Sequence, residues 1–334
     1  MKKLFLFICA LVLVCGSQAQ TLKFGKDKKF TILQLTDTHL DPSKPCRLAE
    51  AVKTFTRINK IIDMERPDWI ILTGDVVTGA PADQMWQRVL DTLDHRGIPY
   101  SIVLGNHEAE QDLTRQEIGR LVISGKHCLN VLNDKGEIAD QELVVESSDS
   151  HRPALALYCM DSHDDSQMEN IDGYGWFSVD QVNWFREAVN ARTASVGGKP
   201  IPGLAFFHIV LHEYVDAWRN PENTRIGRRG EDECPGALNT GMFAAMVETG
   251  SVMGSFVGHD HDIDYLVAEK GICLGYGRYS GDNTTYNNLR QGARVIVLEE
   301  GVRGFESWIR EGDGRMVDHV IFSEGKLKEI FVER

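Results

Sequence analysis

The sequence lacks an apolar run long enough to cross a membrane, internal repeats and an excess of positive charge. Its N-terminal apolar stretch, Leu4–Val14, is shorter than the roughly 20 residues of a membrane-spanning helix. No repeat or low-complexity tract is visible in the 334 residues, which argues against a solenoid. The net charge of −13 at pH 7 repels phosphate backbones, so we expect no long nucleic acid as a partner, although a local positive site could overcome this field.

The first 19 residues have the features of an export signal. Lys2 and Lys3 precede the apolar Leu4–Val14, and small or polar residues follow. Ser17 and Ala19 fit the small-x-small cleavage rule, which predicts a cut after Ala19. We therefore expect a signal peptide over residues 1–19 and a periplasmic or secreted protein.

A lipid anchor is the alternative fate of this segment, because Cys15 ends the apolar run. Val14 argues against it, since a small residue usually precedes a lipidated cysteine. The protein is exported in either case. The alternation of apolar runs and helical patterns continues to the end, so we expect one domain over residues 20–334.

Cysteine is scarce outside the signal segment. The remaining residues are Cys46, Cys128, Cys159, Cys234 and Cys273, and their odd number leaves at least one unpaired. Cys46 and Cys234 lie in expected loops and could form one bridge in an oxidising compartment. Two free thiols at these positions are an equal alternative.

The first third of the chain alternates short apolar runs with helical patterns. Strands are expected over 30–36, 69–73 and 101–104, and helices over 48–65, 83–93 and 114–123. This β-α-β-α-β order is typical of a layered sheet with a helical coat.

The rest of the chain changes character. Strands are expected over 142–145, 154–160 and 203–208, helices over 179–192 and 240–249, and loops over 161–175 and 218–239. Later runs over 254–257, 272–274, 294–298 and 304–309 have little helix between them, and 317–332 suggests an edge strand. We expect a second, more antiparallel sheet facing the first, with helices outside.

Polar motifs follow five of the apolar runs. They are Asp37-Thr38-His39, Gly74-Asp75, Gly105-Asn106-His107-Glu108, His208 and Gly258-His259-Asp260-His261. Open α/β sheets bind their ligands at the carboxyl ends of strands, so these side chains should converge. Imidazole and carboxylate together suit divalent ions of intermediate hardness, and this inventory suits two of them.

Spacing suggests a role for several of these residues. Asp37 and His39 are two residues apart, so both can reach one ion where the strand pleat breaks, and His259 and His261 have the same spacing. Asp75 is the candidate anion between two ions, which relieves their repulsion.

Asn106 and His208 complete the candidate ligands with an amide oxygen and a further imidazole. His212 competes with His208, but His208 directly ends its apolar run. His107 adjoins Asn106 and should point elsewhere, where it could protonate a leaving oxygen. Glu108 could orient it.

The ordered motif set resembles the calcineurin-like metallophosphoesterases over nearly all of the chain. It looks closest to the branch of plant purple-acid-phosphatase-29-like and yeast Dcr2-like phosphatases. That match rests on Phe207-His208-Ile209, Glu213-Tyr214, Gly173-Tyr174-Gly175-Trp176, Asn239-Thr240-Gly241, and Val257–His261 followed by Asp264-Tyr265.

The resemblance implies a four-layer αββα sandwich of two mixed sheets, the metallo-dependent phosphatase fold. It implies that one ion is held by Asp37, His39, Asp75 and His261, and the other by Asp75, Asn106, His208 and His259. It also implies that His107 assists the leaving group. The ions would be divalent, drawn from Zn, Mn, Fe, Ni and Co.

One position departs from the purple acid phosphatases. They carry a tyrosine ligand three residues after the bridging aspartate, and Thr78 stands there. The purple iron–tyrosinate colour should therefore be absent.

These features predict a metal-dependent phosphoric ester hydrolase. A hydroxide bridging the two ions would attack a small phosphate monoester, with His107 assisting the leaving group. A phosphodiesterase or nuclease of the same superfamily is the first alternative, and a non-catalytic phosphate-binding protein is the second. The sequence does not indicate an oligomeric state.

Overall fold

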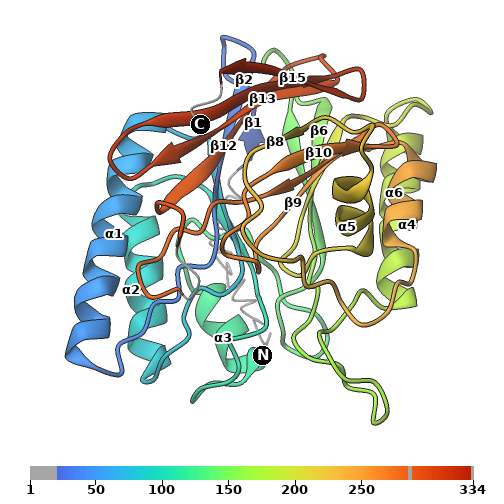
Figure 1. The fold of residues 1–334 in the computed structure, drawn as a ribbon. Helices are drawn as coiled ribbons and strands as arrows, with labels where there is room; N and C mark the ends of the chain where they lie inside the picture. The colour runs from blue at the N-terminus through green and yellow to red at the C-terminus, as the bar shows by residue number, and fades with distance from the viewer. Residues whose placement is uncertain (1–20, 285–287, 332–334) are drawn as a thin grey trace, which may run out of the picture.

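The computed structural model describes residues 21–284 and 288–331, and the predicted signal peptide over residues 1–19 lies outside them. Two β-sheets pack face to face, with α1, α2 and α3 on one side and α4, α5 and α6 on the other (Figure 1). None of the helices within the described ranges is long and apolar enough to cross a membrane.

One sheet has seven strands in the order β15-β14-β13-β12-β2-β3-β4, and the other has eight in the order β1-β5-β6-β7-β9-β11-β10-β8. The strands are β1 (Leu22–Lys23), β2 (Lys29–Leu35), β3 (Trp69–Thr73), β4 (Tyr100–Val103), β5 (Gln141–Glu146), β6 (Pro153–Cys159), β7 (Gly203–Phe206), β8 (Arg225–Ile226), β9 (Val252–Val257), β10 (Leu266–Glu269), β11 (Ile272–Tyr276), β12 (Gly292–Glu299), β13 (Gly304–Glu311), β14 (Met316–Ser323) and β15 (Lys326–Phe331). The helices are α1 (Pro45–Glu65), α2 (Ala82–Asp94), α3 (Arg115–Val122), α4 (Val179–Ser195), α5 (His212–Arg219) and α6 (Met242–Thr249).

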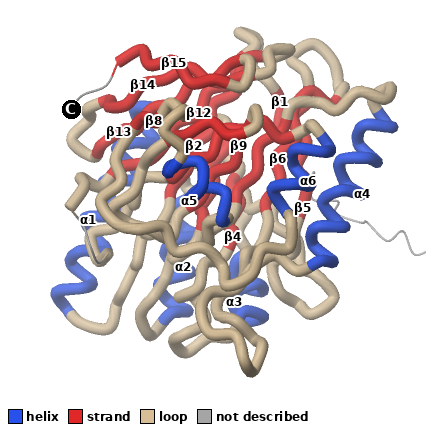
Figure 2. The backbone as a smooth tube through the Cα atoms, turned by 45° about the vertical axis from the view of Figure 1, so that its right-hand side comes forward, coloured by secondary structure: helices blue, strands red, loops and turns tan. Residues whose placement is uncertain are grey.

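The core has three apolar layers, because the central strands are buried on both faces. In β3, Ile70 and Leu72 pack under the helices α1 to α3, while Trp69 and Ile71 face the other sheet. A third layer lies between the eight-stranded sheet and α4 to α6, which Figure 2 shows beside the strands. Strands buried on both faces read as continuous apolar runs, which is why they were recognisable. The predicted αββα layering is confirmed.

The late strands differ from the expectation in two ways. The runs over 294–298 and 304–309 do not build the second sheet, because β12 pairs antiparallel with β2 and extends the first. Residues 317–332 were expected to add one edge strand. Glu324 and Gly325 have φ angles of 51° and 73°, so they form a tight hairpin turn that divides this segment into β14 and β15.

Candidate metal centre

All five predicted motifs lie at the carboxyl ends of parallel strands. In the seven-stranded sheet, β2, β3 and β4 run parallel and lead into Asp37, Asp75 and Asn106. In the eight-stranded sheet, β7 and β9 run parallel and lead into His208 and His259. The site is therefore built where the same ends of two facing sheets meet.

The backbone at these strand ends departs from the extended conformation. Asp37, His39, Asp75 and His259 have φ angles of 50°, 40°, 52° and 79°. Residues other than glycine seldom adopt positive φ, and such positions cluster at functional sites. At β2 the two positive φ angles break the pleat, so that Asp37 and His39 point to the same side.

The glycines of the motifs leave room for their neighbours. A Cβ atom on Gly258 would lie 2.0 Å from Thr36 Oγ1 and 2.7 Å from Asp37 Oδ2. A Cβ atom on Gly74 would lie 2.3 Å from His208 Nδ1, and Gly74 also has a φ of 85°. Substitution at either position would displace a candidate ligand.

Asp37, His39, Asp75 and His261 form one cluster. One potential ligand atom from each lies within 4.8 Å of the others, so the four could hold a metal ion. His39 Nε2 is 3.1 Å from His261 Nε2 and 3.4 Å from Asp75 Oδ2. His261 Nε2 is 3.5 Å from Asp37 Oδ1. The first predicted ligand set is thus assembled around one point.

His208, Asn106 and His259 extend this cluster on the far side of Asp75. His208 Nε2 lies 3.1 Å from Asn106 Oδ1 and 3.3 Å from Asp75 Oδ2. The Nδ1–H of His208 donates to the carbonyl of Thr73 at 2.8 Å, which orients Nε2 toward these oxygens. The rings of His208 and His259 are 5.1 Å apart, which places His259 beside the residue that contacts both Asn106 and Asp75.

Burial and charge at the centre favour a cation. Asp37 and Asp75 are each only 1% exposed, and within the described ranges their ion-pair partners are histidines alone. Burial raises the pKa of Asp75, but His208 and His39 outweigh it and hold this pKa well below its usual value. Among the described residues no Lys or Arg pairs with these two buried carboxylates, so charged imidazoles or a bound cation must balance their charge.

Two histidines show complementary effects of this environment. Burial lowers the pKa of His259 to about 3, so its imidazole is neutral, and its buried Nε2 finds no hydrogen-bond partner in the part of the chain that the structure describes. Burial also disfavours charge on His208, but Asp75 outweighs it and raises the pKa of His208 to about 10. A neutral buried imidazole with an unused nitrogen is a fitting metal ligand. The donor set therefore fits divalent metal ions.

His107 lies beside the cluster. Its ring is 5.7 Å from that of His39 and its side chain is 40% exposed. Glu110, not Glu108, is its partner, with His107 Nδ1 2.8 Å from Glu110 Oε2. Burial lowers the pKa of His107, but Asp75 and Glu110 outweigh it and raise this pKa.

Glu108 is fully buried and fixes two backbone segments. Its carboxylate accepts the N–H of Val76 at 2.6 Å and that of Gly105 at 2.8 Å. The expectation that Glu108 orients His107 is therefore wrong, because both of its oxygens serve the loops that carry Asp75 and Asn106.

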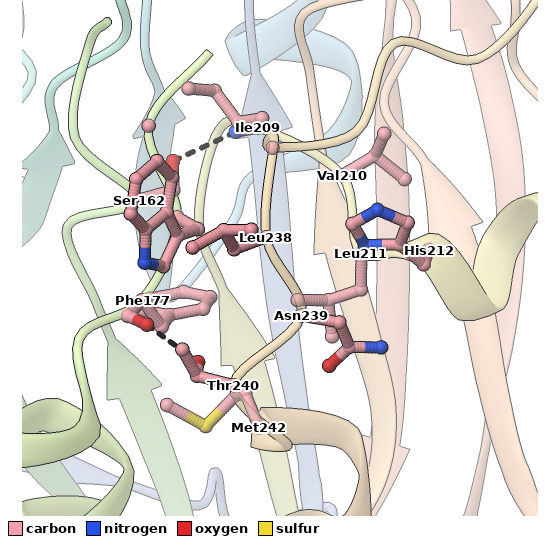
Figure 3. A pocket seen from close by; sticks show the side chains of 13 residues that line it. Ser162, Phe177, Ile209, Val210, Leu211, His212, Leu238, Asn239, Thr240 and Met242 are labelled. Carbon is pink, nitrogen blue, oxygen red and sulfur yellow. Dashed lines mark hydrogen bonds between the residues drawn. The ribbon is translucent and has the colours of Figure 1, made fainter. Parts of the chain in front are cut away.

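His212 does not join the centre. It begins α5 and lines a small pocket with Ile209, Leu238 and Thr240 (Figure 3). That pocket encloses about 20 Å³, close to the roughly 10–15 Å³ that one water needs. The preference for His208 agrees with this geometry.

The arginines at 225–229 have partners of their own. Arg229 pairs with Asp232 and Glu233, Arg225 lies over the Trp218 ring at 5.4 Å, and Arg228 is 3.7 Å from Asp318. Each of these three guanidinium groups therefore has a local contact of its own, away from the candidate metal ligands.

The cysteines outside the signal segment are all free, Cys46 and Cys234 among them. Cys46 is exposed in the first turn of α1, whereas Cys159 and Cys273 are buried in strands. The alternative of two free thiols at positions 46 and 234 therefore describes this structure.

Tyr174 contacts the centre, although sequence reasoning gave it no role. Its ring meets that of His259 at 4.3 Å, nearly perpendicular. It lies in the loop after β6, distant in sequence from His259, so only the packing of the sheets brings them together. The motif Gly173–Trp176 marked this segment without indicating its contact.

Comparison with known proteins identifies the family. The model of the calcineurin-like phosphoesterase family matches residues 30–263. The "Probable inactive purple acid phosphatase 29" of Arabidopsis thaliana is 26% identical over 333 residues, covering 90% of this chain and 85% of that protein. "Phosphatase DCR2" of Saccharomyces cerevisiae is 25% identical over 327 residues, covering 87% of this chain and 55% of that protein.

Solved structures share the fold. A dimetal phosphatase from Danio rerio matches with a TM-score of 0.60 at 14% identity, covering 88% of this chain and 99% of that chain. The purple acid phosphatase PPD1 of yellow lupin matches with a TM-score of 0.52 at 16% identity, covering 90% of this chain and 54% of that chain. The chain belongs to the calcineurin-like phosphoesterase family, a family of metal-dependent phosphoric ester hydrolases.

Proposed function

We propose that this protein is a binuclear-metal phosphatase that hydrolyses small phosphate monoesters. One ion would be held by Asp37, His39, Asp75 and His261, and the other by Asp75, Asn106, His208 and His259. The observation that carries the proposal is the buried pair Asp37 and Asp75, surrounded by imidazoles and an amide from five strand ends.

The chain's own residues would divide the work. When bound, two divalent ions supply Lewis acidity that activates water and neutralises charge on phosphate oxygens. Asp75 contacts His39 of the first ligand set and His208 of the second, so it would be shared between the two ions. His107 is half-exposed and raised in pKa, so it can hold a proton and deliver it to the leaving oxygen. Glu110 would orient that proton.

Monoester preference is the finer part of the proposal. It rests on the relatives named above, which carry phosphatase names. A phosphodiesterase or nuclease has the same metal chemistry and is the alternative. The word "inactive" in the plant relatives' names raises a second alternative, a phosphate-binding protein without turnover. The complete donor set and His107 argue against it here.

A pair of chromogenic esters tests the proposal. The protein, loaded in turn with Zn, Mn, Fe, Ni or Co, is assayed with 4-nitrophenyl phosphate and with bis(4-nitrophenyl) phosphate. We expect the monoester to have the higher kcat/KM. A higher value for the diester would establish the first alternative, and no turnover with any of the metals would establish the second.

Export through residues 1–19, followed by one domain over 20–334, is also proposed. It rests on the paired lysines, the apolar stretch and the Ser17-Gln18-Ala19 site. N-terminal sequencing of protein from the producing cells should find Gln20 first. An intact Met1 or a lipidated Cys15 would replace this proposal.

A further inference from the structure

A cavity of about 220 Å³ lies within the loop that follows β6. Residues 163–168 line one side, and Gly175, Trp176 and Ser178 line the other. The two arms are hydrogen-bonded to each other, from Ser166 N to Gly173 O and from Gly175 N to Asp164 O, both at 2.8 Å. A single water needs roughly 10–15 Å³, so this space admits a group much larger than water.

Tyr174 connects one side of the cavity to the metal centre. Its ring packs on that of His259, and the next residue, Gly175, lines the cavity. Consecutive Cα atoms are only about 3.8 Å apart. One lining residue of the cavity thus directly follows the tyrosine that packs on a candidate metal ligand.

Arg115 is a second link between the cavity and the strand ends of the metal centre. It donates to the carbonyl of Gly105 at 3.3 Å, beside Asn106, and lies 3.8 Å from Asp164, which lines the cavity. It also pairs with Asp161 at 2.6 Å. The loop is thus fixed to the same strand ends that carry the metal candidates.

The lining chemistry restricts what can enter. Trp176 offers an aromatic face and Met168 an adaptable apolar side chain, and most of the exposed lining is apolar. Asp164, Asp165 and His163 are its ionisable groups, and no Lys or Arg of the described residues lines it. A second anionic group would be repelled here, whereas a neutral or cationic organic group could pack on Trp176.

We propose that this cavity receives the organic group of the phosphate ester, and that the preferred substrates carry no negative charge besides the phosphate. Trp176 is then the packing surface and Tyr174 the wall toward the metal ions. This inference rests on the proposed phosphatase function and extends it to the substrate class.

The test compares esters that differ in the organic group. Methyl phosphate does not reach the cavity, 3,3-dimethylbutyl phosphate is neutral beyond the ester, and 3-carboxypropyl phosphate is anionic. We expect kcat/KM for the dimethylbutyl ester to exceed those of the other two by roughly 10-fold or more, as for a few methylenes entering an apolar pocket. Equal values, or preference for the carboxylate, would overturn the proposal.

Variants locate the effect. Trp176→Ala should reduce the ratio of kcat/KM for the dimethylbutyl ester to that for the methyl ester toward one. Trp176→Phe should keep most of the original ratio. Trp308→Ala truncates a half-buried tryptophan on β13 of the other sheet and should leave the ratio unchanged. A ratio that survives in Trp176→Ala would contradict the assignment of the cavity.

Binding separates this proposal from the phosphatase function. Calorimetry of the metal-loaded protein uses the phosphonates matching the methyl and dimethylbutyl esters, which cannot be hydrolysed. Preference for the larger phosphonate, lost in Trp176→Ala, would support the cavity even if no ester is turned over. Turnover of 4-nitrophenyl phosphate without either preference would keep the phosphatase and remove the cavity proposal.

Discussion

At the scale of single residues, neighbours in the sequence have opposite environments. His107 is half-exposed and pairs with Glu110, whereas Glu108 is buried and holds the backbone N–H groups of Val76 and Gly105. Asn106, one residue earlier, faces His208. In the proposed function, three consecutive side chains would thus serve metal binding, proton transfer and loop positioning.

Replacement of His107 tests its proposed role as proton donor. His107→Ala should keep its metal ions and lose roughly 10²–10⁴-fold in kcat, the usual contribution of general acid catalysis. The loss should be smallest for 4-nitrophenyl phosphate, whose leaving group needs little protonation, and largest for an alkyl phosphate. Elemental analysis and kinetics with both esters provide the measurement.

Two results would contradict that role. Loss of a metal ion in His107→Ala would make His107 a ligand. Equal slowing of both esters would make it a charge stabiliser, so that the proton comes from elsewhere. Glu110→Gln is the control, because an exposed ion pair contributes only about 0–1 kcal/mol and the variant should lose less than His107→Ala.

Thr78 leads to a spectroscopic prediction. It stands where purple acid phosphatases have a tyrosine ligand, and its side chain cannot give a tyrosinate-to-iron transition. Protein loaded with iron should therefore show no strong visible band, whereas Thr78→Tyr could gain one. An intense purple colour in the unmodified protein would mean that another tyrosine reaches a metal ion.

At the scale of elements, the first residue of α3 connects two loops of the site. Thr114 and Glu117 form a capping box that fixes where this helix begins. Arg115 follows the cap and pairs with Asp161 after β6, and it also donates to Gly105 after β4. The start of α3 therefore determines how the loops of the two sheets meet.

Arg115→Met should destabilise the protein by about 3 kcal/mol, because it removes the guanidinium partner of the largely buried Asp161 and leaves its carboxylate only His163 among the described residues. Urea unfolding measures the loss. Arg186→Met is the control, since Arg186 pairs with the exposed Glu248 and its removal should cost about 0–1 kcal/mol. Equal losses in the two variants would show that Asp161 finds another partner.

The same pair has a pH signature. Burial raises the pKa of Asp161, but Arg115 outweighs it and lowers this pKa. A carboxylate with a depressed folded pKa stabilises the protein above its unfolded pKa, near 4, and loses that contribution as pH falls. The stability difference between the unmodified protein and Arg115→Met should therefore shrink below about pH 4. A difference that grows in acid would exclude this ion pair as its cause.

Sequence reasoning located the strands of the site but not all of their pairings. Strands buried on both faces, such as β3, can be recognised in the sequence because every residue along them is apolar or buried. The antiparallel pairing of β12 with β2 joins segments more than 200 residues apart and leaves no local signal. The partner of His107 was missed for a similar reason, since only the folded loop shows that Glu110, not Glu108, reaches the ring.

At the scale of the whole molecule, the candidate centre joins the two sheets. Asp37, His39, Asp75 and Asn106 follow strands of the seven-stranded sheet, whereas His208, His259 and His261 follow strands of the eight-stranded sheet. Bound ions would therefore link both halves of the core and relieve repulsion between Asp37 and Asp75.

Metal removal should accordingly lower thermal stability. An ion that binds only the folded state, at a concentration of 1,000 times its Kd, raises the free energy of unfolding by about 4 kcal/mol. In a chain of this size, we expect a chelator to lower Tm by roughly 5–10 °C. Calorimetry at a fixed scan rate, with and without chelator, gives the value, and adding back the ion should restore it. An unchanged Tm after verified metal loss would show that the ions do not hold the sheets together.

The central claim is that seven side chains from two sheets hold two metal ions with Asp75 between them. Elemental analysis of desalted protein tests it most directly, in the unmodified chain, in Asp75→Ala and in the control Glu110→Gln. We predict two ions per chain in the unmodified protein and in Glu110→Gln, and none, or one weakly held, in Asp75→Ala. Two tightly bound ions in Asp75→Ala, or fewer than two in the fully loaded unmodified protein, would contradict it.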